Sequence, residues 1–414
     1  MRLGPEFGRI WLGNASSNLA DGITFVALPL LAAMVTQNPL AVAGLTVAYT
    51  VPRVLAVLGV GVLVDRADRR RLLYLSNFSR AVVFGLLTVL VSLDLASLVV
   101  LYLVFAVMGV VETVSDSSAF AVLPQAVRPQ GLDRANSRIA GTQIVVDEFV
   151  GPPLGGFLFA AAALAPSAVN TLAFLAAGVA YYSLRGDYRQ AEGPRESVLS
   201  EVREGAVWMW RSPVVRTLVV ISALASVAYM IPFSYLVLYS GQVLGLGPTG
   251  YGLLLSASAV GGLVGAWIAE RVRARWGYHR SITGALLTGA LAFAAVPLTD
   301  HAGVVAVLLA VYVGHAVVWN VLAASVRQKA TPARLMGRAG SVNRLLGMSG
   351  LALGALMGGT LASVFGLRPP FLVAGALFLV AVAVCVLAGP RFRAWEAEQE
   401  SGEPAAEGEE REER

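Results

Sequence analysis

The chain has 414 residues, of which 57% are hydrophobic and 14% are charged, with a formal net charge of +5. Soluble domains carry about 25% charged residues, so this composition excludes an ordinary soluble protein. The basic charge needs no nucleic-acid partner, because it falls mainly in short connections between apolar segments, where it sets membrane topology.

Apolar segments of membrane-spanning length follow one another along the chain. About 20 apolar residues cross a bilayer core, and the uncharged runs 22–52, 149–184 and 217–269 each allow two crossings once a turn divides them. Lipid-exposed backbone must be hydrogen-bonded internally and no alternating strand pattern appears, so we predict an all-α membrane protein. The twelve predicted spans are 8–34, 40–64, 72–93, 96–122, 138–163, 168–185, 214–243, 249–270, 280–299, 302–326, 339–363 and 369–389.

Arginine lies on every second connection between these spans, and Arg368 is the one Lys or Arg on the opposite connections. Since basic residues favour the cytoplasmic side, we expect both termini to be cytoplasmic. Lys329 is the sole lysine, which is typical of a high-GC bacterial genome and indicates a multi-pass protein of a bacterial cytoplasmic (inner) membrane. The arginine-bearing connections are 66–71, 128–134, 185–211, 271–275 and 327–338.

The polar stretch 186–213 divides the spans into two groups of six. We predict an N-terminal six-helix bundle over 1–185, a cytoplasmic linker over 186–213 and a C-terminal six-helix bundle over 214–390. Residues 391–414 are rich in Glu, Gly and Arg, so we expect a disordered acidic tail.

The two groups of six share a glycine pattern. Parallel repeats of this kind imply bundles related by an axis along the membrane normal, with a site between them. Chance alignment of glycine-rich helices is the alternative. When the second group of spans is aligned with the first, with an offset of half the span-bearing length, three glycines match. Gly151, Gly155 and Gly156 then align with Gly354, Gly358 and Gly359.

The loop between spans two and three combines Gly61 with the pair Asp65-Arg66 and the cluster that begins Arg69-Arg70. This pattern resembles the signature loop of the major facilitator superfamily. The resemblance implies a gating loop: the glycine permits close helix approach, the acid meets a helix of the other half, and the arginines hold carboxylates and lipid phosphates. A loop that only sets topology is the plainer alternative.

Span five contains Gly151-Pro152-Pro153-Leu154-Gly155-Gly156, which resembles the glycine-proline element of antiporters in the same superfamily. In that family the element marks exporters, although a generic packing motif would look similar. Residues 18–22 and 123–127 also resemble the twelve-span drug exporter branch related to macrolide-efflux and enterobactin-export proteins.

The resemblance implies a secondary active transporter that exports amphipathic, drug-like or cationic small molecules by alternating access, in exchange for protons. The alternatives are a dedicated exporter of one metabolite, such as a siderophore or antibiotic, and a non-transporting membrane sensor. The expected partners are a small-molecule substrate, protons and membrane lipid, with no nucleic acid, and we expect a monomer.

An enzyme is not expected, because the sequence has no Walker loop, nucleophile elbow or His-Glu-x-x-His motif. Cys385 is the only cysteine, so no disulfide or zinc framework can form within one chain. We therefore predict neither a cofactor nor a metal site.

Many proton-coupled drug exporters carry an arginine in the middle of span four, whereas this chain has Glu112 and Asp116 there, four residues apart. The family's usual proton relay therefore cannot be transferred to this sequence. We expect Asp116 to lie near the headgroups and to pair with Arg134 or Arg138.

Ionisable residues within a membrane span are functional candidates, because an unpaired charge is costly there. Counting residues places Asp21 and Arg53 at a similar depth, so we predict an ion pair, either static or exchanged for a proton during transport. Glu112, Glu148 and Asp147 are further proton-coupling candidates, because burial and neighbouring negative charge favour a protonated carboxyl group.

His315, Trp319 and Asn320 share a helical face of span ten. A histidine, an aromatic ring and an amide in this pattern are candidates for lining a substrate cavity. The alternative is a histidine that only completes an interhelical hydrogen bond.

Overall fold

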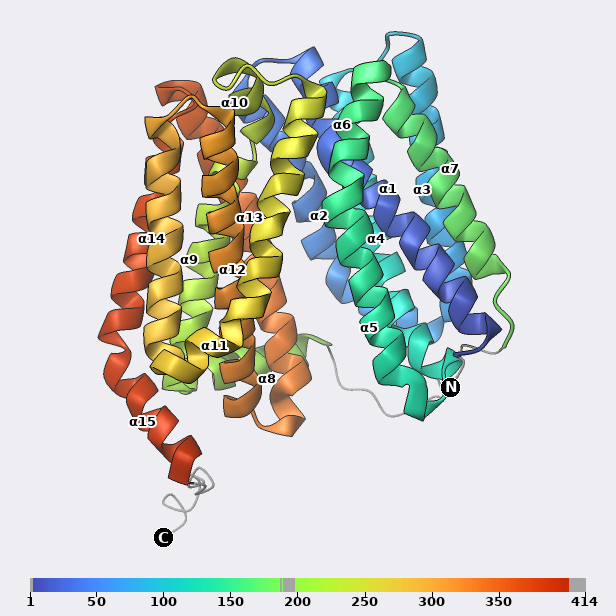
Figure 1. Cartoon of the computed structure of the whole chain (residues 1–414). Coiled ribbons are helices and arrows are strands. Elements are labelled where there is room, and N and C mark those ends of the chain that lie inside the picture. Colours follow the sequence, from blue (N-terminus) through green and yellow to red (C-terminus); the bar gives the residue numbers. More distant parts are fainter. Residues whose placement is uncertain (1–2, 187, 189–197, 402–414) are drawn as a thin grey trace.

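The computed structural model describes residues 3–186, 188 and 198–401, and within these ranges the chain is helical with no strand (Figure 1). The first half contains α1 (Pro5–Val35), α2 (Pro39–Arg66), α3 (Arg69–Ser92), α4 (Leu98–Ala126), α5 (Leu132–Gln143), the π-helix η2 (Ile144–Val150), α6 (Gly151–Ala161) and α7 (Ala165–Tyr182). The second half contains α8 (Val198–Arg211), α9 (Pro213–Phe233), α10 (Leu236–Gln242), α11 (Pro248–Ala295), α12 (Ala302–Ala330), α13 (Met336–Phe365), α14 (Pro369–Leu387) and α15 (Gly389–Ser401). Three-residue 3₁₀ turns follow α4, α11 and α12 at Pro129–Gly131, Val296–Leu298 and Ala333–Leu335.

Ten helical stretches of the described chain are long and apolar enough to cross a membrane. One of them, Pro248–Leu298, contains two arms, because Gly277 adopts a φ of +73° that only glycine accepts readily. With these arms counted separately and α7 added, the described residues make twelve crossings. The structure therefore confirms the predicted all-α fold of two six-helix bundles.

Local sequence explains where several helices begin. The side chain of Asn38 accepts hydrogen bonds from the backbone N–H groups of Leu40 and Ala41, and so caps α2. Asp68 caps α3 by accepting from Arg70 and Arg71 in the same way. Proline, which has no N–H to leave unpaired, occupies the first position of several helices. These residues are Pro5, Pro39, Pro213, Pro248 and Pro369.

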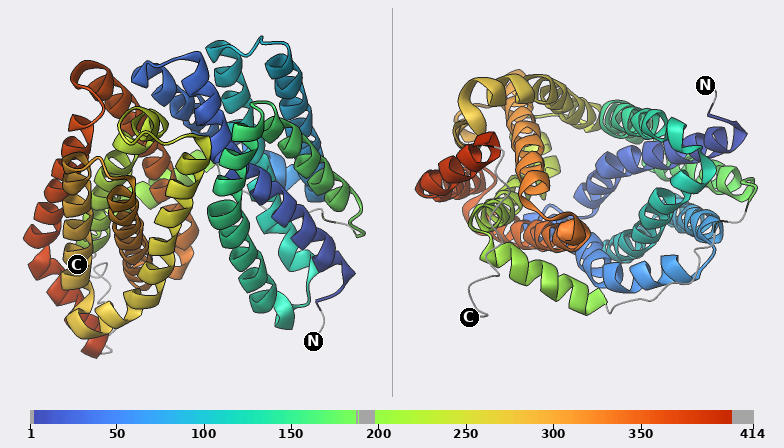
Figure 2. Two further views of the ribbon diagram at one scale, coloured as in Figure 1. Left: turned by 45° about the horizontal axis from the view of Figure 1, so that its top comes forward. Right: turned by 90° about the horizontal axis from the view of Figure 1, so that it is seen from below.

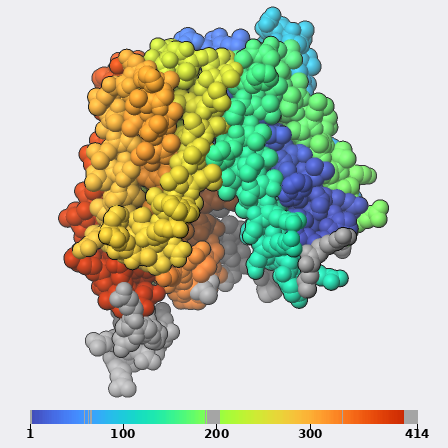
Figure 3. All heavy atoms as spheres, in the orientation of Figure 1, coloured from blue at the N-terminus to red at the C-terminus, as the bar shows by residue number. Residues whose placement is uncertain are grey.

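The two halves lie side by side, with the start of the described chain, α8 and α15 at one end of the molecule (Figures 1 and 2). The halves pack against each other chiefly through α6 with α11 and α2 with α13. These contacts lie at the end away from the termini, whereas the surface is hollowed between the halves at the terminal end (Figure 3). The conformation is thus closed at one end and open at the other.

The closed end depends on glycines of α6. A Cβ at Gly156 would lie 2.4 Å from the carbonyl oxygen of Pro248, the first residue of α11. A Cβ at Gly155 would lie 2.9 Å from the carbonyl oxygen of Ile23 on α1. The first glycine therefore faces the other half, and the second faces the first helix of its own half.

The same contacts recur in the second half. A Cβ at Gly359 on α13 would lie 2.8 Å from the Cα of Leu40, in the first turn of α2. A Cβ at Gly358 would lie 2.0 Å from the carbonyl oxygen of Ile231 on α9, the first membrane-crossing helix of that half. The two halves therefore close the molecule with matching pairs of glycines.

The predicted disorder of the tail is wrong for residues 391–401, which belong to α15. Phe392 and Trp395 are buried, and Trp395 packs edge-on against the ring of Tyr278 on α11. These aromatic side chains hold the helix on the bundle, and residues 402–414 lie outside the described chain. In the predicted linker 186–213, residues 198–211 form α8, which packs against α13.

Candidate functional site

An ion-pair cluster lies inside the first half. Arg53 on α2 donates from Nη1 to Oε1 of Glu112 at 2.8 Å and from Nη2 to Oδ2 of Asp116 at 3.0 Å. The hydroxyl of Tyr49 also donates to Glu112 Oε1, at 2.6 Å. Both carboxylates of α4 therefore bind one guanidinium, as their spacing of four residues allows.

A second guanidinium completes the cluster. Arg80 on α3 is 1% exposed and donates to Asp21 Oδ1 and, at 2.9 Å, to Ser17 Oγ. Its Nη2 also lies 3.8 Å from Glu112 Oε2, and its guanidinium lies 4.1 Å from the ring centroid of Phe174. Burial of this arginine is possible because a carboxylate and an aromatic face compensate for its lost hydration.

The predicted Asp21–Arg53 pair is wrong, as is the pairing of Asp116 with Arg134 or Arg138. Residue counting gives depth along a helix but not which helices are neighbours. Here α2 packs chiefly against α4, so Arg53 reaches the acids of α4, while Asp21 meets Arg80 of α3.

Span five changes from an α-helix to a π-helix where its acidic residues lie. The π-helix η2 holds Asp147 and Glu148 and runs directly into Gly151-Pro152-Pro153. Each proline lacks the N–H that would bond the carbonyl four residues earlier, so the carbonyls of Glu148 and Phe149 have no α-helical donor at that spacing. The hydroxyl of Ser256 on α11 lies 3.5 Å and 3.3 Å from these two oxygens. A serine of one half thus binds the carbonyls that the prolines free in the other.

The carboxylates of Asp147 and Glu148 have no hydrogen-bond or ion-pair partner among the described residues, and both line a cavity. The backbone of Asp147 packs on α1, where a Cβ at Gly22 would lie 2.6 Å from the Asp147 carbonyl oxygen. This contact brings Asp147 close to Asp21 and its cluster. Unpaired acids beside a cavity can bind either a proton or a cationic ligand.

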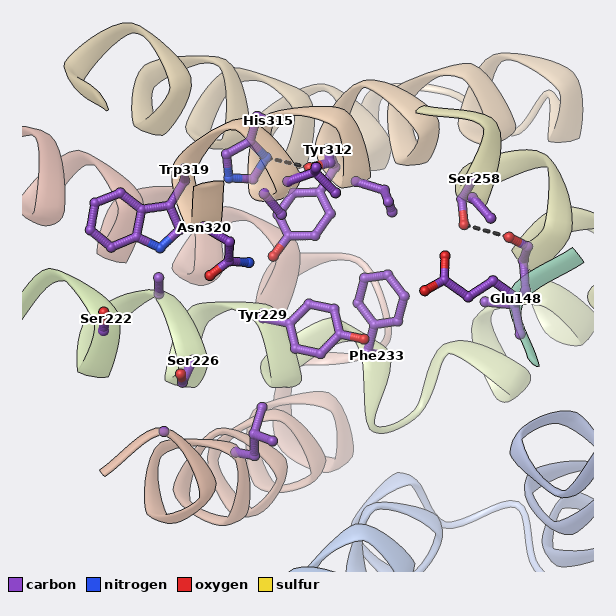
Figure 4. A pocket seen from close by; sticks show the side chains of 18 of the residues that line it. Glu148, Ser222, Ser226, Tyr229, Phe233, Ser258, Tyr312, His315, Trp319 and Asn320 are labelled. Atoms are coloured by element: carbon purple, nitrogen blue, oxygen red, sulfur yellow. Dashed lines mark hydrogen bonds between the residues drawn. The ribbon is translucent and has the colours of Figure 1, made fainter. Parts of the chain in front are cut away.

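The cavity measures about 510 Å³ and lies between the halves, with most of its wall from the second half. Glu148 lies at one end, with its carboxylate directed into the cavity, and Trp319 and Ser222 lie towards the other (Figure 4). Tyr229 and Phe233 of α9 lie between these ends, their ring centroids 4.5 Å apart. An aromatic wall facing acids suits a ligand that is apolar in its body and positively charged.

The structure places His315, Trp319 and Asn320 together on this wall. The Nδ1 atom of His315 pairs with the backbone carbonyl of Tyr312, and the ring packs edge-on against Tyr312. His315 is 5% exposed, so it supports the wall, while Asn320 presents its amide to the cavity (Figure 4).

The loop of the superfamily signature makes contacts that the sequence did not predict. A Cβ at Gly61 would meet nothing within 4 Å, so no close helix approach occurs there in this conformation. Arg69 donates to the carbonyl of Ala121 at 3.3 Å and Arg70 to that of Tyr182 at 2.6 Å, within their own half. Asp65 and Arg66 end α2, and their side chains lie outside the described part of the chain.

Sequence reasoning missed Arg80, Ser256 and the Tyr229–Phe233 wall. Arg80 could have been found, because it is an ionisable residue inside a predicted span. Ser256 and the aromatic residues carry no such signal, since hydroxyls and rings are common in membrane helices.

Two six-helix bundles that close at one end around a cavity between them define a membrane transporter of the major facilitator superfamily. The chain belongs to the transmembrane secretion effector family, whose model matches residues 4–412.

Two relatives with curated functions cover most of the chain. The multidrug efflux pump Tap of Mycolicibacterium fortuitum is 28% identical over 396 residues, covering 91% of this chain and 94% of the relative. The enterobactin exporter EntS of Salmonella typhi is 26% identical over 363 residues, covering 86% and 85%. The protein is thus a multi-pass transporter of the efflux and secretion type.

The fold is also seen in a crystal structure of a bacterial homologue of the human lysosomal transporter Spinster in an inward-facing, unoccupied conformation. That structure aligns with a TM-score of 0.74 at 16% identity and covers 94% of this chain and 98% of its own.

Proposed function

We propose that the protein exports amphipathic, cationic small molecules by alternating access in exchange for protons. The observation that carries the proposal is the pair Asp147 and Glu148, which face the cavity opposite an aromatic wall and have no counter-ion among the described residues. A proton and a cationic substrate compete for such a carboxylate, and this competition couples their movement in opposite directions.

The ion-pair cluster supports the same mechanism. On α1, α2, α3 and α4, the carboxylates of Asp21, Glu112 and Asp116 face the guanidiniums of Arg53 and Arg80. With three carboxyl groups to two guanidiniums, the cluster places an excess acidic group near Asp147. We assign Glu148 and Asp147 to proton and substrate exchange, and Asp21 and Glu112 to the ion pairs that change partners as the halves move.

The open end is assigned to the cytoplasm of a bacterial inner membrane, because the described arginine-bearing connections, the start of α1 and the helix α15 lie there. In this conformation the cavity would accept substrate from the cytoplasm. Movement about the closed end would then expose the cavity to the opposite side.

The test is proton release from purified protein in lipid nanodiscs on addition of ethidium, followed with a pH dye in weak buffer. The wild type should release protons, and Glu148→Gln should abolish the release while retaining weaker binding. Asp300→Asn is the matched control, because this acid is paired with Arg368 and is not on the cavity wall. Ethidium binding without proton release in the wild type would refute proton exchange.

Export of one dedicated metabolite is a second candidate, favoured by the similarity to an enterobactin exporter. A panel of chemically unrelated cationic drugs distinguishes the two, using a susceptible host that expresses the protein. Resistance to several drugs supports broad efflux, whereas resistance to none of them favours a dedicated substrate.

A further inference from the structure

We infer that the cavity contains an anion-binding subsite at Arg327, so that its preferred ligand is an aromatic zwitterion rather than a simple cation. The inference rests on the proposed function, since it concerns the same cavity. It starts from the charges on the cavity wall, which are Asp147, Glu148 and Arg327 among the described residues.

Arg327 differs in its partner from Arg53 and Arg80, the two arginines of the ion-pair cluster. Arg53 and Arg80 bind carboxylates, whereas Nη1 of Arg327 donates to a neutral amide, Oδ1 of Asn343 on α13, at 3.0 Å. A guanidinium has five N–H donors, so one bond to Asn343 leaves donors for a ligand. Arg327 therefore keeps its full charge on the cavity wall.

The positions of the charges separate them along the cavity. On α12, Arg327 comes fifteen residues after Tyr312, so their backbones are ~22 Å apart along the helix. The distance between their side-chain ends can be shorter, because both side chains are long. Glu148 lies at the end of the cavity near Phe233 and Tyr312 (Figure 4). Glu148 and Arg327 therefore lie towards opposite ends of the cavity.

The middle of the cavity is aromatic and weakly polar. Figure 4 shows Asn320 between Tyr229 and Trp319, and on α12 Trp319 lies between Tyr312 and Arg327. A ligand complementary to this wall has a flat apolar body and two charged groups. Its cationic group is directed towards Glu148, and its carboxylate, sulfonate or phosphate is directed towards Arg327. A planar guanidinium suits such anions because it can bind two oxygens at once.

The test compares rhodamine B, whose carboxylate is free, with rhodamine B ethyl ester, which lacks that negative charge but keeps the cationic ring system. Binding is measured by fluorescence anisotropy in nanodiscs of neutral phosphatidylcholine, so that no anionic lipid competes for Arg327. The wild type should bind rhodamine B roughly tenfold more tightly than the ester, a factor that corresponds to about 1.4 kcal/mol.

Arg327→Gln should remove this preference by weakening the binding of rhodamine B. The cationic ester should bind at least as tightly as it does to the wild type, because the positive charge that repels it is gone, and this retained binding also shows that the variant is folded. Arg327→Lys should retain part of the preference, because the charge remains. Arg334→Gln is the matched control: this arginine is exposed, lies 3.7 Å from Glu204 and is not on the cavity wall.

Equal binding of both dyes by the wild type, or a preference that survives Arg327→Gln, would overturn the inference. Either result leaves the proposed function standing if Glu148→Gln still weakens binding of the ester. Failure of the wild type to bind either dye would instead count against the proposed function, and the subsite would fall with it.

Discussion

Gly156 on α6 touches the backbone of Pro248, the residue that starts α11: a Cβ on this glycine would lie 2.4 Å from the proline carbonyl oxygen. The contact is reciprocal, because a Cβ on Gly252 of α11 would lie 2.3 Å from the carbonyl oxygen of Pro152. Two helices from different halves therefore meet backbone to backbone, and any side chain at either glycine must push them apart.

We predict that Gly156→Leu opens the closed end. Overpacking of this kind costs ~1–3 kcal/mol, which corresponds to a population shift of roughly 5–150-fold. The shift is measured with Ser226→Cys, a cavity residue, labelled by a membrane-impermeant maleimide added to intact cells. Gly141→Leu on the same span is the control, since a Cβ at Gly141 meets nothing within 4 Å. Equal labelling of the two variants would contradict the prediction.

The Arg80–Asp21 pair should be strongly coupled. Arg80→Gln leaves a carboxylate in the bundle without its main partner, and breaking a buried pair costs about 3–5 kcal/mol. Adding Asp21→Asn should recover part of that loss, because it removes the uncompensated charge. The free energies of unfolding of the three variants in mixed micelles form a double-mutant cycle. Additive losses would show that the pair contributes no coupling.

Ser256→Ala should loosen span five. The hydroxyl binds the carbonyls of Glu148 and Phe149, and loss of such a bond costs about 1 kcal/mol. Amide hydrogen exchange of 144–151 should accelerate about fivefold as a result. Ser258→Ala is the control, because that hydroxyl bonds the carbonyl of Leu255 in its own helix at 2.6 Å. If both variants behave alike, the contact between the halves has no separate effect.

Glu396→Ala should destabilise the second arm of α11. Oε1 of Glu396, on α15, accepts from the backbone N–H of Tyr278 at 2.5 Å, where the helix restarts after Gly277. Removing a helix cap costs about 1 kcal/mol, so hydrogen exchange at residues 278–282 should rise and thermal stability should fall. Gln399→Ala, an exposed change on the same helix, should do neither. An unchanged exchange rate in Glu396→Ala would show that α15 does not stabilise this turn.

The twelve crossings and their order were predictable from local sequence. Helix existence depends on local quantities: the length of an apolar run, a proline such as Pro39 at a helix start, and a cap such as Asp68. The glycines of span five were also predicted to be packing positions, because glycine in a membrane helix allows a neighbouring helix to approach closely. The tail helix α15 was missed, since its stability comes from docking Phe392 and Trp395 on the bundle.

The pairing of the charges is set by tertiary packing. Residue counting placed Asp21 and Arg53 at one depth, but the rotation of each helix and the choice of its neighbours arise from packing between segments far apart in sequence. Arg53 therefore pairs with Glu112, 59 residues away, and Asp21 with Arg80. The contact of Ser256 with the carbonyl of Glu148 spans 108 residues for the same reason. The depth of a charged residue in the membrane follows from the local sequence pattern. Its ion-pair partner depends on how the helices pack.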